Sequence, residues 1–152
     1  MEDNLSKKEA RARELFANNY NCAQSVFGVF CEDEGLDLKT ALKLANGFGG
    51  GFRCGEACGA VSGAIMAIGL KCGFYIEKDI AQKNFCNSKT YEFIEKFTAE
   101  HSTILCRELL DADIRRPEDH NPPDVREKHR TICPGVVAAA VRVLEGMDFT
   151  NR

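Results

Sequence analysis

The spacing of apolar residues constrains the fold more than any other feature of this sequence. Apolar side chains recur at intervals of three and four residues through most of the chain, which is typical of helices with one buried face. No segment shows the sustained alternation of β-branched residues that a half-buried strand requires. We therefore predict an all-α, single-domain helical bundle of about six or seven helices. The expected helices cover residues 5–19, 22–30, 38–45, 57–70, 77–100, 103–112 and 133–146.

Polar residues mark where several of these helices begin. Asn21 and Asp37 stand directly before the second and third helical patterns, and both residue types are favoured N-caps. Ser102 or Thr103 has the same relation to the short segment 103–112. We expect these side chains to cap their helices.

The second half of the chain contains stronger interruptions. Residues 77–100 form one long helix or two helices broken near 86–90. Residues 115–127 are rich in proline and charge, which predicts a loop. The last helix is then expected to begin at Cys133, with Pro134 at the favoured first-turn position.

Length and charge bound the size and the partners of the protein. The 152 residues fit one domain, residues 1–152, and can bury a core without disulfides. The net charge of −3, with both signs interleaved, gives no basic stripe, so we expect no nucleic-acid partner. Residues 1–20 are charged where a signal peptide is apolar, and the longest apolar stretch, 57–70, is too short to span a bilayer. We expect a cytoplasmic protein without membrane insertion.

Eight cysteines are many for a chain in a reducing compartment. About half are expected to pack as small apolar residues. The remainder are candidates for chemistry, because Cys22, Cys58, Cys106 and Cys133 each fall on an apolar stripe at or near a predicted helix start. Amide groups at a helix start stabilise a thiolate and lower its pKa. Such thiols oxidise or bind metal more readily.

The segment 47–63 combines glycines with two cysteines, Cys54 and Cys58. Glycine lets a backbone turn sharply and approach another group closely. We expect this segment to form one wall of a thiol site. Four glycines are candidates to border a bound group: Gly49, Gly50, Gly59 and Gly63.

The helix expected at 57–70 also has a face of small residues, formed by Ala60, Gly63, Ala64 and Ala67. Another backbone can approach such a face closely. The face packs against a helix of the same chain or forms a homodimer surface, and packing inside one subunit is the simpler interpretation.

With these segments in place, the chain resembles the redox-active family named C_GCAxxG_C_C. The resemblance covers nearly the whole chain and rests on the segments NCAQSV, GFGGGFRCGEACGAVSGAIMAIGLKCG, FTAEHSTILCREL and KHRTICPGVVAAAV. The matching residues are Cys22 for the first cysteine, Cys58, Gly59, Ala60 and Gly63 for the central motif, and Cys106 and Cys133 for the last two. The resemblance implies a small helical protein in which these four cysteines are the functional set and bind a redox-active metal or another redox group.

Three functions remain open from the sequence. In the first, the four cysteines bind zinc or an iron–sulfur group, since thiolates suit both, and the protein exchanges electrons with an unknown redox partner protein. In the second, the protein is a thiol–disulfide oxidoreductase or redox sensor in which Cys58 attacks and Cys54 or Cys22 resolves. In the third, the cysteines only pack in a non-catalytic domain. The sequence leaves open whether the protein is an enzyme.

The remaining polar residues give weaker indications of function than the cysteines. His101, His120 and His129 are expected in or near loops and solvated, with no imidazole beside the cysteines. Arg53 and Glu56 flank the cysteine pair and can tune a thiolate or bind an anion, although exposed charges beside a loop are usually only solvated. No Ser-His-Asp order and no phosphate loop with lysine is present, which disfavours a hydrolase or kinase.

Overall fold

The structure, a computed structural model, describes residues 4–150, which form seven α-helices joined by turns and by two longer segments, 46–58 and 111–122. Within that range there is no β-strand, so the predicted all-α class is confirmed. None of these helices is both long and apolar enough to cross a bilayer. The helices are α1 (Lys7–Ala17), α2 (Cys22–Phe30), α3 (Leu38–Ala45), α4 (Gly59–Cys72), α5 (Ile80–His101), α6 (Cys106–Leu110) and α7 (Pro123–Glu145).

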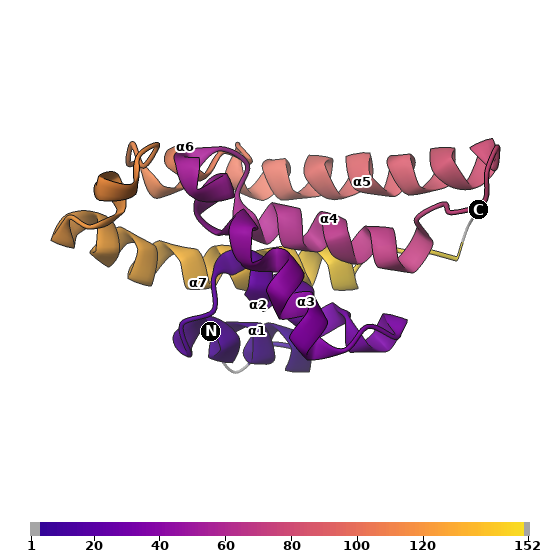
Figure 1. Cartoon of the computed structure of the whole chain (residues 1–152), viewed down its shortest axis with the longest axis horizontal. Coiled ribbons are helices and arrows are strands. Elements are labelled where there is room, and N and C mark those ends of the chain that lie inside the picture. Colours follow the sequence, from indigo (N-terminus) through magenta and orange to yellow (C-terminus); the bar gives the residue numbers. More distant parts are fainter. Residues whose placement is uncertain (1–3, 151–152) are drawn as a thin grey trace.

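The arrangement places α4 between the other helices. Figure 1 shows α4, α5 and α7 along the long axis of the molecule, with α1, α2 and α3 on one side of them. The largest helix interface is between α2 and α4, and α4 also packs against α5 and α7. One apolar core contains residues of all seven helices, from Ala12 in α1 to Leu144 in α7. The first cysteine of the family pattern therefore lies on the helix that packs most extensively against α4.

The N-caps of α2 and α3 follow from the sequence. Asn21 forms a capping box with Gln24, in which each side chain accepts a hydrogen bond from the other residue's backbone N–H. The Asp37 carboxylate accepts a hydrogen bond from the backbone N–H of Thr40. Such caps stabilise a helix by about 1 kcal/mol each. Both predicted N-caps are confirmed.

The small-residue face of α4 packs inside the chain. Ala60, Ala64 and Ala67 are completely buried. A Cβ atom on Gly63 would lie 2.7 Å from the carbonyl oxygen of Ala23, closer than two such atoms can approach. The face is therefore in backbone contact with α2, as the simpler interpretation of the sequence predicts.

The structure settles the continuity of α5 and corrects the predicted start of α6. Residues Ile80–His101 form one unbroken helix, which decides between the two alternatives. Neither Ser102 nor Thr103 caps α6, contrary to prediction, because Leu105 is the N-cap residue and the helix begins at Cys106. Ser102 instead ends α5 in the left-handed backbone region, with φ of 70°.

The predicted start of the last helix is wrong by ten residues. α7 begins at Pro123, directly after Pro122, because a proline in the first turn needs no hydrogen-bond donor. Part of the segment predicted as a loop is thus the start of α7. Pro134 lies inside the helix, and Cys133 is a mid-helix residue and not a helix-start residue.

The glycine-rich loop has an uncommon backbone. Four consecutive residues, 50–53, have positive φ, between 60° and 65°. Glycine adopts this conformation freely, but Phe52 and Arg53 have side chains that oppose it, at about 1–2 kcal/mol each. Strain of this kind persists only where the surrounding structure imposes it.

Candidate metal centre

All four cysteines of the expected functional set line one cavity of about 200 Å³. Cys22 is the first residue of α2, Cys58 the N-cap residue of α4, Cys106 the first residue of α6 and Cys133 a residue in the middle of α7. Cys106 is half-buried and the other three are buried. The remaining walls are mainly apolar: Leu109, Leu110, Ile114, Val125, Ile132 and Val136. The cavity thus brings together sulfur atoms from four segments that are remote in the sequence.

A short backbone pairing brings Cys58 and Cys106 to the same side of the cavity. Ala57 and Leu105 form an isolated antiparallel β-bridge. The amide of Cys58 donates a hydrogen bond to the carbonyl oxygen of Ile104, and the amide of Cys106 donates one to the carbonyl oxygen of Glu56, both at 2.7 Å. These bonds link the start of α4 directly to the start of α6.

Cys22 and Cys133 form the other half of the site. A hydrogen bond links the thiols of Cys22 and Cys133. This bond lowers the pKa of Cys133 and raises that of Cys22, which is increased further by burial and by the other thiols of the cavity. Cys133 is the member of the pair that ionises first.

Position at a helix start does not lower the pKa of Cys58 or Cys106, contrary to expectation. Burial raises the pKa of Cys58 to about 11, although the backbone N–H groups of Ala60 and Val61 at the start of α4 act in the opposite direction. Burial and the neighbouring thiols raise the pKa of Cys106 to about 12. In the absence of a bound cation, desolvation outweighs the helix-start effect.

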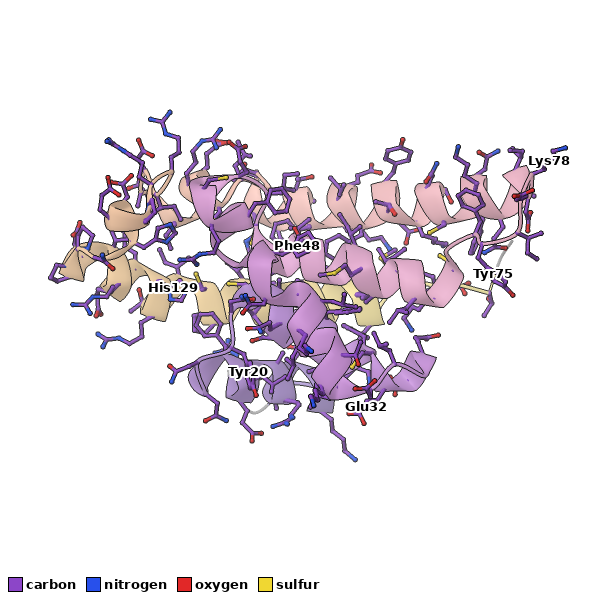
Figure 2. All side chains as sticks on the ribbon, in the orientation of Figure 1. Tyr20, Glu32, Phe48, Tyr75, Lys78 and His129 are labelled. Atoms are coloured by element: carbon purple, nitrogen blue, oxygen red, sulfur yellow. The ribbon has the colours of Figure 1, made fainter. Side chains whose placement is uncertain are left out.

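His129 also belongs to the site, which the sequence did not predict. It lies on α7, one turn before Cys133, and Figure 2 shows it beside side-chain sulfur atoms. Its ring contacts that of Phe16, with centroids 5.1 Å apart. His129 is an exposed residue, but its ring is partly desolvated where it lies against Phe16 and the cavity, and this desolvation, with the nearby positive charges of Arg53 and His120, lowers its pKa. The imidazole is therefore neutral at neutral pH, which is the form that binds metals.

A metal ion fits the chemistry and the spacing of these donors. A ring nitrogen of His129 and the sulfur atoms of Cys22 and Cys133 all lie within 4.8 Å of one another. Ligand atoms around one tetrahedral zinc ion lie roughly 3.5–4 Å apart, so the group is close to metal-binding spacing. Thiolate and imidazole ligands suit zinc, iron or copper better than calcium or magnesium.

Three of the other residues proposed from the sequence lie outside the cavity lining: Cys54, Gly49 and Gly63. Cys54 is absent from the lining, and its thiol donates to the carbonyl oxygen of Gly51 at 3.5 Å. Gly49 and Gly63 serve helix packing, since a Cβ on Gly49 would lie 2.4 Å from the Asn21 side chain and Gly63 contacts α2. Two of the four candidate glycines do line the cavity: Gly50 and Gly59.

Cysteines outside the family pattern have no part in this lining. The Cys31 and Cys72 thiols are buried and donate to backbone carbonyl oxygens in their own helices, each at 3.3 Å. Cys86 is half-buried on α5. Within residues 4–150, no disulfide joins any of these cysteines. The structure therefore separates the four cavity cysteines from the other four.

Comparison with known families gives one match. The family model "Putative redox-active protein (C_GCAxxG_C_C)" matches residues 20–147. The chain belongs to this family of redox-active proteins. Searches of curated proteins and of solved structures found no match.

Proposed function

We propose that the protein is an electron-transfer protein whose cavity cysteines bind a redox-active metal or an iron–sulfur group. Cys22, Cys58, Cys106 and Cys133 would be the ligands, and His129 is an alternative or additional one. The observation that carries the proposal is the presence of all four family cysteines around one cavity. When bound, the group would supply the site that accepts and releases an electron, and a partner protein would exchange that electron.

The residues of the chain would tune such a group in two ways. The backbone N–H groups of Ala60 and Val61 lie at the start of α4 and favour the thiolate form of Cys58, so they are placed to donate to a ligand sulfur. Hydrogen bonds to ligand sulfurs are one of the factors that set the potential of thiolate-bound iron. The apolar wall residues keep water from the sulfurs, which also affects potential and protects the site from oxidation.

The test is metal analysis of protein purified without oxygen. We expect a stoichiometric amount of iron, which is lost in the Cys58→Ser variant; stoichiometric zinc, which has no redox chemistry, would indicate a metal site but contradict electron transfer. Cys31→Ser is the matched control, because Cys31 is equally buried but lies outside the cavity. Circular dichroism of both variants separates loss of ligand from loss of fold. Metal-free wild-type protein, or a Cys58→Ser variant that is folded and keeps its metal, would contradict the proposal.

A disulfide-exchange function is the second candidate, and the Cys22–Cys133 hydrogen bond favours it. The Cys133 thiolate would attack one sulfur of a disulfide substrate, forming a mixed disulfide and releasing one substrate thiolate. Cys22 would then lose its proton and displace the second substrate thiolate, leaving a Cys22–Cys133 disulfide. Both protein thiols are oxidised and one substrate disulfide is reduced to two thiols. Cys54 is less suited to this role because it lies outside the cavity. Cys58 is less suited because burial raises its pKa to about 11.

Mild oxidation of metal-free protein with oxidised glutathione tests this candidate. Peptide mapping should identify a reversible Cys22–Cys133 disulfide that is absent from the Cys133→Ser variant. Cys86→Ser, a half-buried cysteine on α5, is the control and should leave the disulfide unchanged. Failure of the pair to form would exclude the disulfide mechanism and leave the metal proposal unaffected.

A further inference from the structure

The polar lining of the thiol cavity is entirely basic. Besides the cysteines, the titratable side chains that line it are Arg53, Arg126, His120 and His129. No aspartate or glutamate of residues 4–150 takes part in the lining. This composition contrasts with the net charge of −3 of the whole chain. Positive charge is therefore concentrated where the sulfur atoms are.

The guanidinium groups of the two lining arginines differ from those of their neighbours in their partners among the described residues. Arg130, four residues after Arg126 on α7, is ion-paired with Glu127, and Arg107 is ion-paired with Glu56. Within residues 4–150, no ion pair or side-chain hydrogen bond is formed by the guanidinium of Arg53 or Arg126. Both arginines are exposed at the mouth of the cavity, so their guanidinium donors are open to solvent and to a ligand there.

The backbone holds Arg53 at this position against its own preference. Arg53 has φ of 62° inside the left-handed turn, and its carbonyl oxygen lies 3.3 Å from the Nε2 atom of His120. A Cβ on Gly50 would lie 3.0 Å from the Nη1 atom of Arg53 and 3.3 Å from the Cε1 atom of His120. Gly50 is itself part of the lining, so the guanidinium and the imidazole sit close together beside the cavity.

We infer that the cavity binds a small oxyanion or carboxylate between Arg53 and Arg126, next to the thiols. Guanidinium groups suit such ligands because their planar donors match pairs of carboxylate or oxyanion oxygens. The cavity volume of about 200 Å³ admits only a small ligand. The inference deepens the proposed function by naming the chemical class of the molecule that would reach the redox site, and it rests on that function for the role of the thiols.

Two alkylating reagents of nearly equal size but different charge test the inference on reduced, metal-free protein. Iodoacetate is an anion and iodoacetamide is neutral. With both, the thiolate sulfur forms a bond to carbon and iodide leaves. The readout is the ratio of the two alkylation rates at Cys106 and Cys133, resolved by peptide mapping and compared with the same ratio for free cysteine. We expect this ratio to be several-fold higher at the cavity cysteines.

Arginine variants identify the source of the preference. Arg53→Gln and Arg126→Gln should each lower the iodoacetate preference by roughly two- to fivefold, the effect expected for one partly exposed charge. Arg130→Gln changes the net charge equally but removes an arginine outside the lining, and should leave the ratio unchanged. Sulfate at millimolar concentration should slow iodoacetate in the wild type by competition.

The outcomes separate this inference from the proposed function. A rate ratio equal to that of free cysteine, or equal losses in Arg126→Gln and Arg130→Gln, would overturn the anion site. Because the assay uses metal-free protein, a chain that binds no metal can still pass it. A chain that binds metal but shows no anion preference would keep the proposed function and lose the anion site. An iodoacetate preference without competition by sulfate would also overturn the inference, by indicating general charge attraction.

Discussion

Replacing Gly63 with alanine tests whether α2 and α4 are in backbone contact. The new Cβ would lie 2.7 Å from the Ala23 carbonyl oxygen, whereas ordinary contact begins at 3.4 Å. The helices would therefore have to separate by about 0.7 Å, the difference between these two distances. Because the obstructing atom belongs to the backbone, no rotamer change can relieve the contact.

The magnitude follows from two opposing effects. Overpacking a core costs about 1–3 kcal/mol, and a backbone contact belongs at the upper end of that range. Alanine is favoured over glycine inside a helix by about 1 kcal/mol. Gly63→Ala should therefore reduce the free energy of unfolding by about 2 kcal/mol. For a chain of this length the unfolding midpoint falls by about 4–8 °C.

Gly69→Ala is the matched control, since Gly69 lies on the same helix with no atom within 4 Å of the added Cβ. It should stabilise the protein by about 0.5–1 kcal/mol. Urea unfolding followed by circular dichroism, on reduced protein, measures both variants. Gly63→Ala should also weaken metal binding, because α2 carries Cys22 and the N-cap of α4 is Cys58. Equal stability of the two variants would refute the close contact of α2 with α4.

Three further predictions concern pH, a helix cap and the left-handed turn. The raised pKa values of Cys58 and Cys106, about 11 and 12, make the metal-free protein fully stable only below about pH 9, and stability should fall between pH 9 and 12. The raised pKa of Cys58 alone accounts for a loss of free energy of unfolding on the order of 3 kcal/mol at alkaline pH. Urea unfolding of Cys58→Ala should therefore show a smaller loss of stability at alkaline pH than the wild type. An equal loss would contradict the raised pKa of Cys58. Asn21→Ala removes one half of the capping box and should cost about 1 kcal/mol in the same assay, and an unchanged midpoint would refute the cap. Arg53→Gly relieves the strain of the left-handed backbone and should raise the free energy of unfolding by about 0.5–1 kcal/mol. The same variant should lose the preference for iodoacetate. A destabilised variant would show that Arg53 has a structural role.

The regular part of the fold could be predicted from local signals. The caps Asn21 and Asp37 and the apolar spacing after them define α2 and α3, because both signals act within one turn of helix. The start of α7 could not be predicted in this way. Residues 123–132 are mostly exposed and polar, so they lack an apolar stripe, and prolines stop a helix as readily as they start one.

The candidate site also has a part that could be predicted from the sequence and a part that could not. The cysteines could be selected because each falls on an apolar stripe and matches a family pattern. The sequence pattern places His129 near a loop because it gives no sign that α7 begins at Pro123, so it does not reveal the helical register that brings His129 beside Cys133. Raised thiol pKa values depend on burial by distant segments, which local spacing does not report. The orientation of Arg53 depends on a backbone conformation that its residue type disfavours.

The distribution of the cavity cysteines along the chain has a consequence for how the protein is made. Cys22 and Cys58 are synthesised early, whereas Cys133 follows only when most of the 152 residues have left the ribosome. Domains fold as units once their contacts are available, and α7 packs against α1, α2 and α4. No complete thiol set exists on the growing chain. If the cysteines bind a metal as proposed, its insertion would follow the synthesis of α7, and until then the early thiols depend on the reducing power of their surroundings.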